Sequence, residues 1–403
     1  MLLDVSTAFA AVMNTVRDFG REDLPFTAVA GRVLREPVLA DRPFPPFDRA
    51  TMDGIAINFA ESYGKGQTIF GVEDMQPAGM PRKQLGNMAN CIEVMTGAVI
   101  PELTDTVVPY EHLQATEHEG FKRFTITQPV QKNQNIHWQG ADGVAGQTLI
   151  TPGTRLTPAE TGVLATVGKH TVSVSRLPRV VVIATGDELV AVTATPEPHQ
   201  IRMSNVYSLA ASLQELGITA SIHHVTDNKA AIQELLASLL NADVWICSGA
   251  VSAGKYDHLP AVLETMGMQR IFHKVRQRPG KPFLFGLFKD GPVVFALPGN
   301  PVSGFMCFYR YVQPWLLAGM GYAAPPAAYA VLGKDVVFDK PLTYFLPVQL
   351  QPQPTGEWKA FPHTYNGSGD LVSLLQADAF MELPAAQSEF KAGECYPVWK
   401  FRN

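Results

Sequence analysis

The sequence predicts a multi-domain protein of the α/β-plus-β class. The chain has 403 residues, more than one hydrophobic core usually organises. Residues 179–319 alternate buried-strand and helical patterns, which predicts a largely parallel sheet with helices on both faces. Residues 45–146, and the stretch from about residue 322 onward, carry short β-branched or alternating runs, so we expect two further β domains.

Within the α/β region each element follows from its hydrophobic pattern. The expected strands are residues 180–184, 220–225 and 243–247, and the expected helices are residues 205–216, 229–240 and 258–266. The first 18 residues form an amphipathic run without a basic leader, which predicts a helix of the fold.

The two β regions are predicted from different runs. In the first, residues 105–108 and 124–127 lie among many Gly, Pro and Asn residues. In the second, residues 335–338 and 344–348 alternate apolar and polar side chains.

Composition excludes several classes of protein. With 46% hydrophobic and 17% charged residues, the chain lacks the signature of disorder. Its formal charge of −5 argues against a nucleic-acid partner. The four cysteines form no CxxC pair, so neither a disulfide framework nor a zinc site is expected, and a cytoplasmic location fits. Residues 298–301 interrupt the apolar stretch 293–309, so no membrane segment is expected.

Polar, glycine-containing segments follow the predicted strands. In parallel sheets ligands collect beyond the carboxyl ends of the strands, so chemistry is expected there. The segments are Thr185-Gly186-Asp187-Glu188, Thr226-Asp227-Asn228, residues 248–254 and Leu297-Pro298-Gly299-Asn300-Pro301.

The tetrapeptide from Thr185 to Glu188 is a candidate cation site. Gly186 allows a ligand to approach the backbone, and the adjacent carboxylates of Asp187 and Glu188 can hold a hard cation. The alternative is a turn whose aspartate caps a helix.

Residues 248–254 are a candidate oxyanion loop. Ser248 and Ser252 supply hydroxyls, Gly249 helps to expose backbone N–H groups, and Asp257 lies just beyond. The loop matches neither the GxGxxG nor the GxxxxGK[ST] pattern, which lowers the dinucleotide-fold and P-loop interpretations.

Two more segments suit an anion. Residues 274–282 concentrate four cations, among them Lys274, Arg278 and Lys281, in a turn stiffened by prolines; the alternative is a solvated turn. Asn300 and Ser303 lie near the start of a predicted helix, where anions are favoured.

Outside the predicted sheet, the residue types alone do not indicate a function. Asp53 in Met52-Asp53-Gly54 could hold a turn, and Thr96 lies in Met95-Thr96-Gly97-Ala98. His223 and His224 point to opposite faces of a strand, which favours ordinary packing over metal chelation.

Taken in order, these motifs resemble the MoeA family of molybdopterin molybdenumtransferases, which includes the gephyrin E domain. The resemblance covers nearly the whole chain. It is carried by residues 46–54, 95–98, 105–109 with Glu111, 185–189, 248–254 with Asp257, 278–282, 297–303 and 367–369.

The resemblance implies four domains per subunit of a homodimer. They are a linker domain (22–44 and 147–177), a β-rich domain (45–146), a three-layer αβα molybdopterin-binding, MogA-like domain (1–21 and 178–323) and a C-terminal β-barrel domain (324–403). The site would lie between the sheet domain of one subunit and the β-rich domain of its partner. The earlier adenylyltransferase and the apoenzymes that accept the cofactor are implied as further partners.

The resemblance also implies a reaction. Adenylylated molybdopterin would be cleaved with Mg²⁺ while molybdate joins the dithiolene and AMP leaves. The implied metal ligands are Asp187, Glu188 and Asp257, and the implied catalytic residues are Asp53, Asp142, Asp187, Glu188, Asp227, Asp257 and Lys274. The implied substrate-binding residues are Thr96, Thr185, Gly186, Ser248, Gly249, Ser252, Arg278, Lys281, Asn300 and Ser303. Among these, Ser252, Arg278, Lys281 and Ser303 would hold molybdate.

The chain departs from the family pattern at several positions. An Arg-x-x-Gly-Glu-Asp segment is replaced by residues 137–142, His-Trp-Gln-Gly-Ala-Asp, which keep Asp142 but lose the arginine and the glutamate. Ala250 replaces a glycine, Arg278 replaces a lysine, and Ala50 and Ile55 replace a serine and a tyrosine. The contacts in the β-rich domain are therefore less secure than those at the sheet edge.

Two alternative functions are a non-catalytic scaffold of the same fold and a molybdopterin adenylyltransferase. The retained carboxylates at 187, 188, 227 and 257 speak against a scaffold, because clustered carboxylates repel one another without a cation. The two β regions around the sheet domain argue for the later step rather than adenylylation.

Overall fold

A computed structural model describes residues 2–118, 120–249, 251, 257–363 and 367–402. The chain forms two compact units, and each is described by itself. The first unit comprises Met1–Glu36, Pro152–Pro158 and Thr171–Asn403, and the second comprises Pro37–Thr151 and Ala159–His170. The borders of the four predicted domains stay a prediction.

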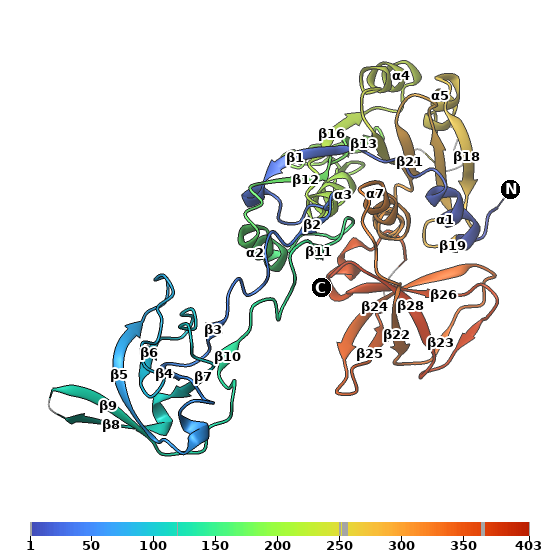
Figure 1. Cartoon of the computed structure of the whole chain (residues 1–403). Helices are drawn as coiled ribbons and strands as arrows, with labels where there is room; N and C mark the ends of the chain where they lie inside the picture. The colour runs from blue at the N-terminus through green and yellow to red at the C-terminus, as the bar shows by residue number, and fades with distance from the viewer. Residues whose placement is uncertain (1, 119, 250, 252–256, 364–366, 403) are drawn as a thin grey trace. The chain divides into compact units, whose positions relative to one another are not determined.

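A six-stranded sheet forms the centre of the first unit (Figure 1). Its strands, in spatial order, are β16 (Ser221–Val225), β13 (Val180–Thr185), β17 (Val244–Ser248), β21 (Val293–Leu297), β20 (Pro282–Leu287) and β18 (Gln269–Lys274). The first four strands are mutually parallel, whereas β20 runs antiparallel to both of its neighbours. The three strands predicted for the α/β region are therefore confirmed.

Helices cover both faces of this sheet. Alternate residues of β13 serve the two faces: Val180 and Val182 pack in one core, and Val181 and Ile183 in the other. The first face carries α1 (Val5–Met13), α3 (Asn205–Gln214), α6 (Pro301–Cys307), the π-helix η4 (Phe308–Val312) and α7 (Gln313–Gly319); the second carries α4 (Lys229–Ser238) and α5 (Leu259–Thr265). The predicted three-layer αβα arrangement is confirmed.

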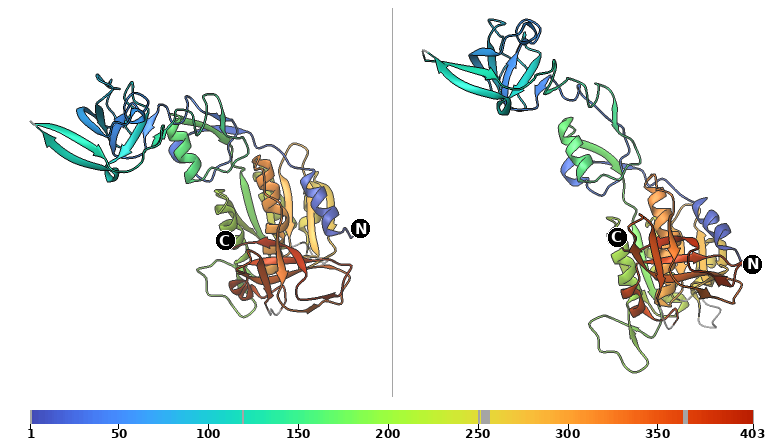
Figure 2. Two further views of the ribbon diagram at one scale, coloured as in Figure 1. Left: turned by 60° about the horizontal axis from the view of Figure 1, so that its bottom comes forward. Right: turned by 90° about the horizontal axis from the view of Figure 1, so that it is seen from below.

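The C-terminal strands close into a five-stranded barrel. The ring runs β24-β25-β22-β28-β26 and closes through the pairing of β26 with β24, which leaves no open sheet edge within the ring. The strands are β22 (Ala328–Leu332), β24 (Thr343–Pro352), β25 (Trp358–Pro362), β26 (Ala379–Leu383) and β28 (Cys395–Lys400). The short strand β19 (Gln277–Arg278) adds to β24, so the segment between β18 and β20 joins the barrel to the αβα domain. In both views of Figure 2 the red C-terminal strands lie beside the yellow and orange elements of the αβα domain.

The second unit is built around another six-stranded sheet, of order β7-β4-β6-β5-β9-β8. Its strands are β4 (Gly54–Ile57), β5 (Ile69–Gln76), β6 (Cys91–Val94), β7 (Thr106–Pro109), β8 (Leu113–His118) and β9 (Phe121–Ile126). The predicted β-rich region is confirmed by these strands.

Short elements connect these parts. The remaining strands are β1 (Arg21–Pro25), β2 (Val38–Leu39), β3 (Arg49–Ala50), β10 (Ile136–His137), β11 (Thr148–Ile150), β12 (Thr171–Ser175), β14 (Leu189–Val190), β15 (Ile201–Arg202), β23 (Val336–Val337) and β27 (Glu389–Phe390). The remaining helices are α2 (Pro158–Thr166) and the 3₁₀ segments η1 (Phe26–Ala28), η2 (Tyr63–Lys65), η3 (Tyr110–His112) and η5 (Leu371–Gln376). None of the helices in the described part of the chain has the length and apolar character needed to cross a lipid bilayer.

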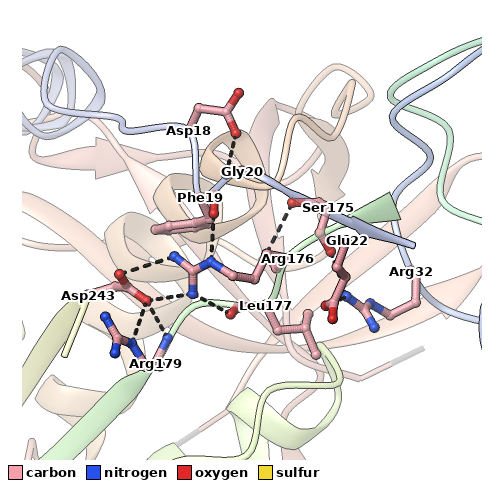
Figure 3. A network of polar contacts seen from close by, with 10 residues as sticks. All are labelled: Asp18, Phe19, Gly20, Glu22, Arg32, Ser175, Arg176, Leu177, Arg179 and Asp243. Atoms are coloured by element: carbon pink, nitrogen blue, oxygen red, sulfur yellow. Dashed lines mark hydrogen bonds and ion pairs between the residues drawn. The ribbon is translucent and has the colours of Figure 1, made fainter. Parts of the chain in front are cut away.

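An arginine network ties the amino-terminal edge of the central sheet to the segment before β1 (Figure 3). The Arg176 guanidinium donates to both carboxylate oxygens of Asp243, at 2.9 and 3.2 Å, and to the Phe19 carbonyl at 2.7 Å. The Arg179 backbone N–H donates to the same carboxylate at 2.7 Å. Burial of Asp243 opposes its ionisation, but these hydrogen bonds and charges outweigh that effect and lower its pKa.

We predict that Asp243→Asn destabilises the first unit. Hydrogen bonds to a charged group contribute about 1.5–3 kcal/mol, so the free energy of unfolding should fall by about that amount at pH 7. Because the pKa of Asp243 is lowered on folding, its contribution is present above the unfolded pKa and is lost as pH falls through the folded value. Denaturant titrations at pH 7 and pH 3 should therefore show a smaller difference at pH 3. An Asp23→Asn control, at an exposed position on β1, should change little; equal losses in both variants would contradict the prediction.

Candidate functional site

A cleft of about 700 Å³ opens at the carboxyl edge of the central sheet. Each of the four parallel strands contributes the segment that follows it. The predicted residues that line the cleft are Thr185, Gly186, Glu188, Asp227, Ser248, Gly249, Asp257 and Asn300. Gly369 and Leu371, from the barrel side, complete one wall. The structure thus brings most residues predicted for the sheet edge into one cavity.

The acidic residues at this cleft lie near one another: Glu188, Asp227 and Asp257 line it, and Asp187 adjoins them. The Asp227 backbone N–H donates to the Asp187 carboxylate at 3.1 Å, which connects the segments after β13 and β16. Burial raises the pKa of Asp227, and the negative charges of Asp187, Glu188 and Asp257 raise it further. The turn that holds Asp187 leads into strand β14, so it does not cap a helix.

The acidic residues supply the oxygen ligands that Mg²⁺ prefers. The Asp227 Oδ1 atom is buried and has no hydrogen-bond partner among the described residues, which is the kind of group that a cation satisfies. Within the same residues, no three His, Cys, Asp or Glu side chains are already gathered as a metal site. This donor set fits an ion that keeps several waters and binds through one or two carboxylates together with substrate phosphates.

Two glycines set the shape of the cleft floor. Gly249 has a φ of +103°, and a Cβ atom at this position would lie 2.7 Å from the Thr185 carbonyl oxygen. Gly186 has a φ of +145°, and a Cβ atom there would lie 2.5 Å from the Glu188 carboxylate. Side chains at either position would close the space between the strand ends.

Two backbone amides at the cleft are already paired, and residues 250 and 252–254 of the expected oxyanion loop lie outside the described part of the chain. The Gly249 N–H donates to the Leu297 carbonyl at 3.2 Å, and the Gly186 N–H reaches the Val225 carbonyl at 3.4 Å. These amides hold adjacent strand ends together and are not available to an anion. Ser252 lies outside the described residues.

The cationic residues lie beside the cleft and do not line it. Lys281 immediately precedes Pro282, which does line the cleft. Lys274, Arg278 and Lys281 are exposed. Ser303 is buried in helix α6 and does not line the cavity, because the start of the helix turns its side chain into the core.

Sequence reasoning missed several polar residues that hold the cleft loops. Asn205, at the start of α3, donates to the Ser248 hydroxyl at 3.1 Å and to the Gly299 carbonyl at 2.6 Å. His224 contacts the Gly186 carbonyl through Nε2 at 2.9 Å, so it does more than pack in the sheet. Asn205 could have been found as a polar residue at the start of a predicted helix. Nothing in the sequence indicated the partner of His224.

The residues predicted in the second unit also come together there. Asp53 accepts hydrogen bonds from the Thr96 backbone N–H at 2.6 Å and from the Thr96 hydroxyl at 2.9 Å, and the pKa of Asp53 is lowered by the backbone bond first and the hydroxyl bond second. The Thr51 N–H donates to the Asn135 carbonyl, so the segment carrying Asp53 adjoins the segment carrying Asp142.

Asp142 is held by His137, which replaces the expected arginine. His137 Nε2 lies 3.0 Å from Asp142 Oδ1, and His137 Nδ1 lies 3.1 Å from an Arg49 nitrogen. A guanidinium can only donate, so Nδ1 accepts and Nε2 carries the hydrogen that Asp142 receives. His137, at the position of the missing arginine, thus donates a hydrogen bond to Asp142.

Comparisons with known proteins agree with this architecture. Models of the MoeA N-terminal region (domains I and II), a probable molybdopterin-binding domain and the MoeA C-terminal region (domain IV) match residues 3–168, 181–318 and 329–401. The chain is 36% identical to a molybdopterin molybdenumtransferase of Synechocystis over 99% of this chain and 100% of that protein. It is 35% identical to one from Bacillus subtilis over 92% and 88%.

A solved structure is similar over the same length. A molybdopterin biosynthesis MoeA protein from Pyrococcus horikosii superposes with a TM-score of 0.82 at 29% identity and covers all of both chains. The full-length identity to named relatives and the three matching regions in order lead to one conclusion: the chain belongs to the MoeA family of molybdopterin molybdenumtransferases.

Proposed function

We propose that this chain acts in molybdenum cofactor biosynthesis by inserting molybdate into adenylylated molybdopterin, with Mg²⁺-dependent release of AMP. The observation that carries the proposal is the cleft at the carboxyl edge of the sheet, which carboxylates from three separate segments line and whose lining residue Pro282 follows directly on a cationic loop. Carboxylates suit a divalent cation, and the cationic loop suits an oxyanion.

The roles of the acidic residues follow from their positions. Asp187, Glu188 and Asp257 would hold Mg²⁺, and the half-buried Asp227 would orient the attacking water or the ion's water ligands. When bound, Mg²⁺ would shield the charge of the phosphoryl groups and stabilise the leaving phosphate. The Asp227 backbone N–H keeps the Asp187 carboxylate in place for this task.

The cationic residues would receive the second substrate. Arg278 and Lys281 carry full positive charges on a loop stiffened by two prolines, and molybdate is a tetrahedral dianion. Lys274 at the end of β18 adds to the same positive region. Ser248 and Asn300 line the cleft and can donate hydrogen bonds to the pyrophosphate.

We further propose that the active enzyme is a homodimer. Asp53, Thr96 and Asp142 would then serve a cleft of the partner subunit. Their support is the convergence of three segments in the second unit: the Asp53–Thr96 hydrogen bonds, the Asp142–His137 hydrogen bond and the backbone bonds between these segments.

The first prediction concerns the reaction. Purified protein with Mg²⁺ and molybdate should release AMP from adenylylated molybdopterin, and Asp257→Ala should slow the release about 10²–10³-fold, as expected for loss of a group that stabilises transition-state charge. Asp290→Ala, at an exposed position before β21 on the opposite sheet edge, is the matched control and should remain active.

The same assay separates the alternatives. No AMP release by the wild type would favour a scaffold. ATP consumption in the presence of molybdopterin, without AMP release from the adenylylated form, would identify an adenylyltransferase instead.

The second prediction concerns the cation. With Mg²⁺ at about ten times its dissociation constant, linkage predicts stabilisation of about 1.4 kcal/mol and a higher thermal midpoint. Asp187→Asn should abolish this increase. Without Mg²⁺ the variant should be at least as stable as the wild type, because Asp187 repels the Asp227 carboxylate. A Mg²⁺ response that survives in Asp187→Asn would remove this residue from the metal site.

The third prediction concerns His137. Long-range proton–nitrogen correlation spectra at pH 8, where an ordinary imidazole is neutral, should show the hydrogen on Nε2. Arg49→Leu removes the donor to Nδ1 and should produce a mixture of tautomers. His118, at the exposed end of β8, is an internal reference expected to show such a mixture in the wild type. A hydrogen on Nδ1 of His137 in the wild type would contradict the assignment.

A further inference from the structure

The cationic loop is organised around a buried glutamine. In residues 275–279 exposed and buried side chains alternate: Arg276 and Arg278 are exposed, and Val275, Gln277 and Pro279 are buried. Gln277 is fully buried, which is unusual for a polar residue in a loop. The loop closes through a backbone hydrogen bond from the Val275 N–H to the Lys281 carbonyl at 3.0 Å. The two sides of the loop are thus fixed relative to one another.

Both ends of the Gln277 amide are engaged. Nε2 donates to the Gly280 carbonyl at 2.9 Å, and Oε1 accepts from the Tyr311 hydroxyl at 2.5 Å. The Gly280 carbonyl can only accept, so the amide nitrogen must face it and the amide oxygen must face Tyr311. Along the chain, Pro279 and Gly280 separate the two exposed cations, Arg278 and Lys281.

Gly280 leaves no room for another arrangement. Its φ is +87°, and a Cβ atom there would lie 2.8 Å from Cys307 Sγ and 2.9 Å from Gln277 Nε2. The loop therefore presses against helix α6 on one side and against Gln277 on the other. A displacement of the Gln277 amide would therefore displace Gly280 as well.

Tyr311 is itself fixed by its surroundings. It lies in the π-helix η4, within the helical run from α6 to α7. Its ring is fully buried and packs 5.0 Å from the ring of Phe283. The preceding residue, Arg310, pairs with Glu382 at 2.9 Å and lies 4.2 Å from the Trp399 ring centre. π-helical turns are rare and often found at functional sites.

We propose that Tyr311 and Gln277 are positioning residues for the cationic loop. Tyr311 holds the Gln277 amide, the amide holds the Gly280 carbonyl, and this connection keeps Arg278 and Lys281 at the spacing that a tetrahedral oxyanion requires. Neither residue contacts the substrate. The inference rests on the proposed function in one respect, the identity of the oxyanion as molybdate.

The geometry of the π-helix supplies a matched control. Tyr309 lies in the same π-helix and is also buried, but its hydroxyl lies 3.2 Å from the Ser212 hydroxyl on helix α3. Tyr309→Phe and Tyr311→Phe each remove one buried phenol hydroxyl from one helical turn. Only Tyr311→Phe removes the hydrogen-bond donor of the Gln277 amide oxygen.

Two measurements test the proposal. The first is amide hydrogen exchange of Val275, whose N–H closes the loop; it should accelerate about tenfold in Tyr311→Phe and less than about twofold in Tyr309→Phe. The second is the molybdate concentration that gives half-maximal AMP release, which should rise about tenfold in Tyr311→Phe with a smaller change in kcat. The Tyr309→Phe control should leave both values near those of the wild type.

The outcomes separate the inference from the proposed function. Equal Val275 exchange in the two variants would overturn the positioning role, whether or not AMP is released. Faster exchange in Tyr311→Phe alone, in a protein that releases no AMP, would support the positioning role and overturn the reaction.

A second variant covers failure to fold. If Tyr311→Phe does not fold, Tyr311→Phe combined with Gln277→Met removes both partners, which is better tolerated than leaving one buried amide unpaired. In this double variant Val275 exchange should still be faster than in Tyr309→Phe. Exchange as slow as in the control would overturn the inference.

Discussion

The common level at which four parallel strands end is the constraint on which the site depends. Thr185 is in register with Val225, Ala184 with Ser248, and Ser248 with Leu297. Each strand is followed by a polar segment, so the register alone brings residues more than a hundred positions apart to the rim of one cleft. The hydrophobic cores on both sheet faces fix this register, because a shift by one residue would exchange the buried sets of β13.

Negative charge gathers at the carboxyl edge of the central sheet, and the resulting repulsion between carboxylates must be offset. Carboxylates from two other segments, Asp187 with Glu188 and Asp257, lie near enough to raise the pKa of Asp227, which is unfavourable without a counter-ion. Part of this repulsion is offset within the fold: the Asp187 carboxylate accepts a backbone hydrogen bond, and the charge of His258 acts to lower the pKa of Asp227. One oxygen of Asp227 has no partner among the described residues, so a bound cation would stabilise the folded state further. Cations of the opposite sign to this cluster lie on the loop of residues 274–282, which Gln277 anchors into the core.

The sequence sufficed for the elements and for most of the cleft because both depend on local patterns. Periodicity of apolar residues placed β13, α3 and α4, and the polar segments after strands then located Thr185, Asp227 and Ser248 at one rim. Contacts between residues far apart in the sequence could not be predicted from these local patterns. Asn205, His224 and Gln277 act through side-chain or carbonyl partners that lie 34 or more positions away in the chain. Ser303 shows the opposite error: its place near a helix start was right, but the side chain points into the core.

His137, at the position of the expected arginine, provides a hydrogen-bond donor to Asp142 with different atoms. An arginine would offer Asp142 a permanent charge, whereas a neutral imidazole offers one N–H, directed by the Arg49 guanidinium behind it. Arg49 and His137 are direct partners in the antiparallel pair of β3 and β10, so the backbone places the two side chains next to each other. The positive charge is thus carried by Arg49, which contacts the His137 ring and does not itself donate to Asp142 in these hydrogen bonds. Charge in this position orients the carboxylate without neutralising it, which leaves Asp142 able to accept a second hydrogen bond from a ligand.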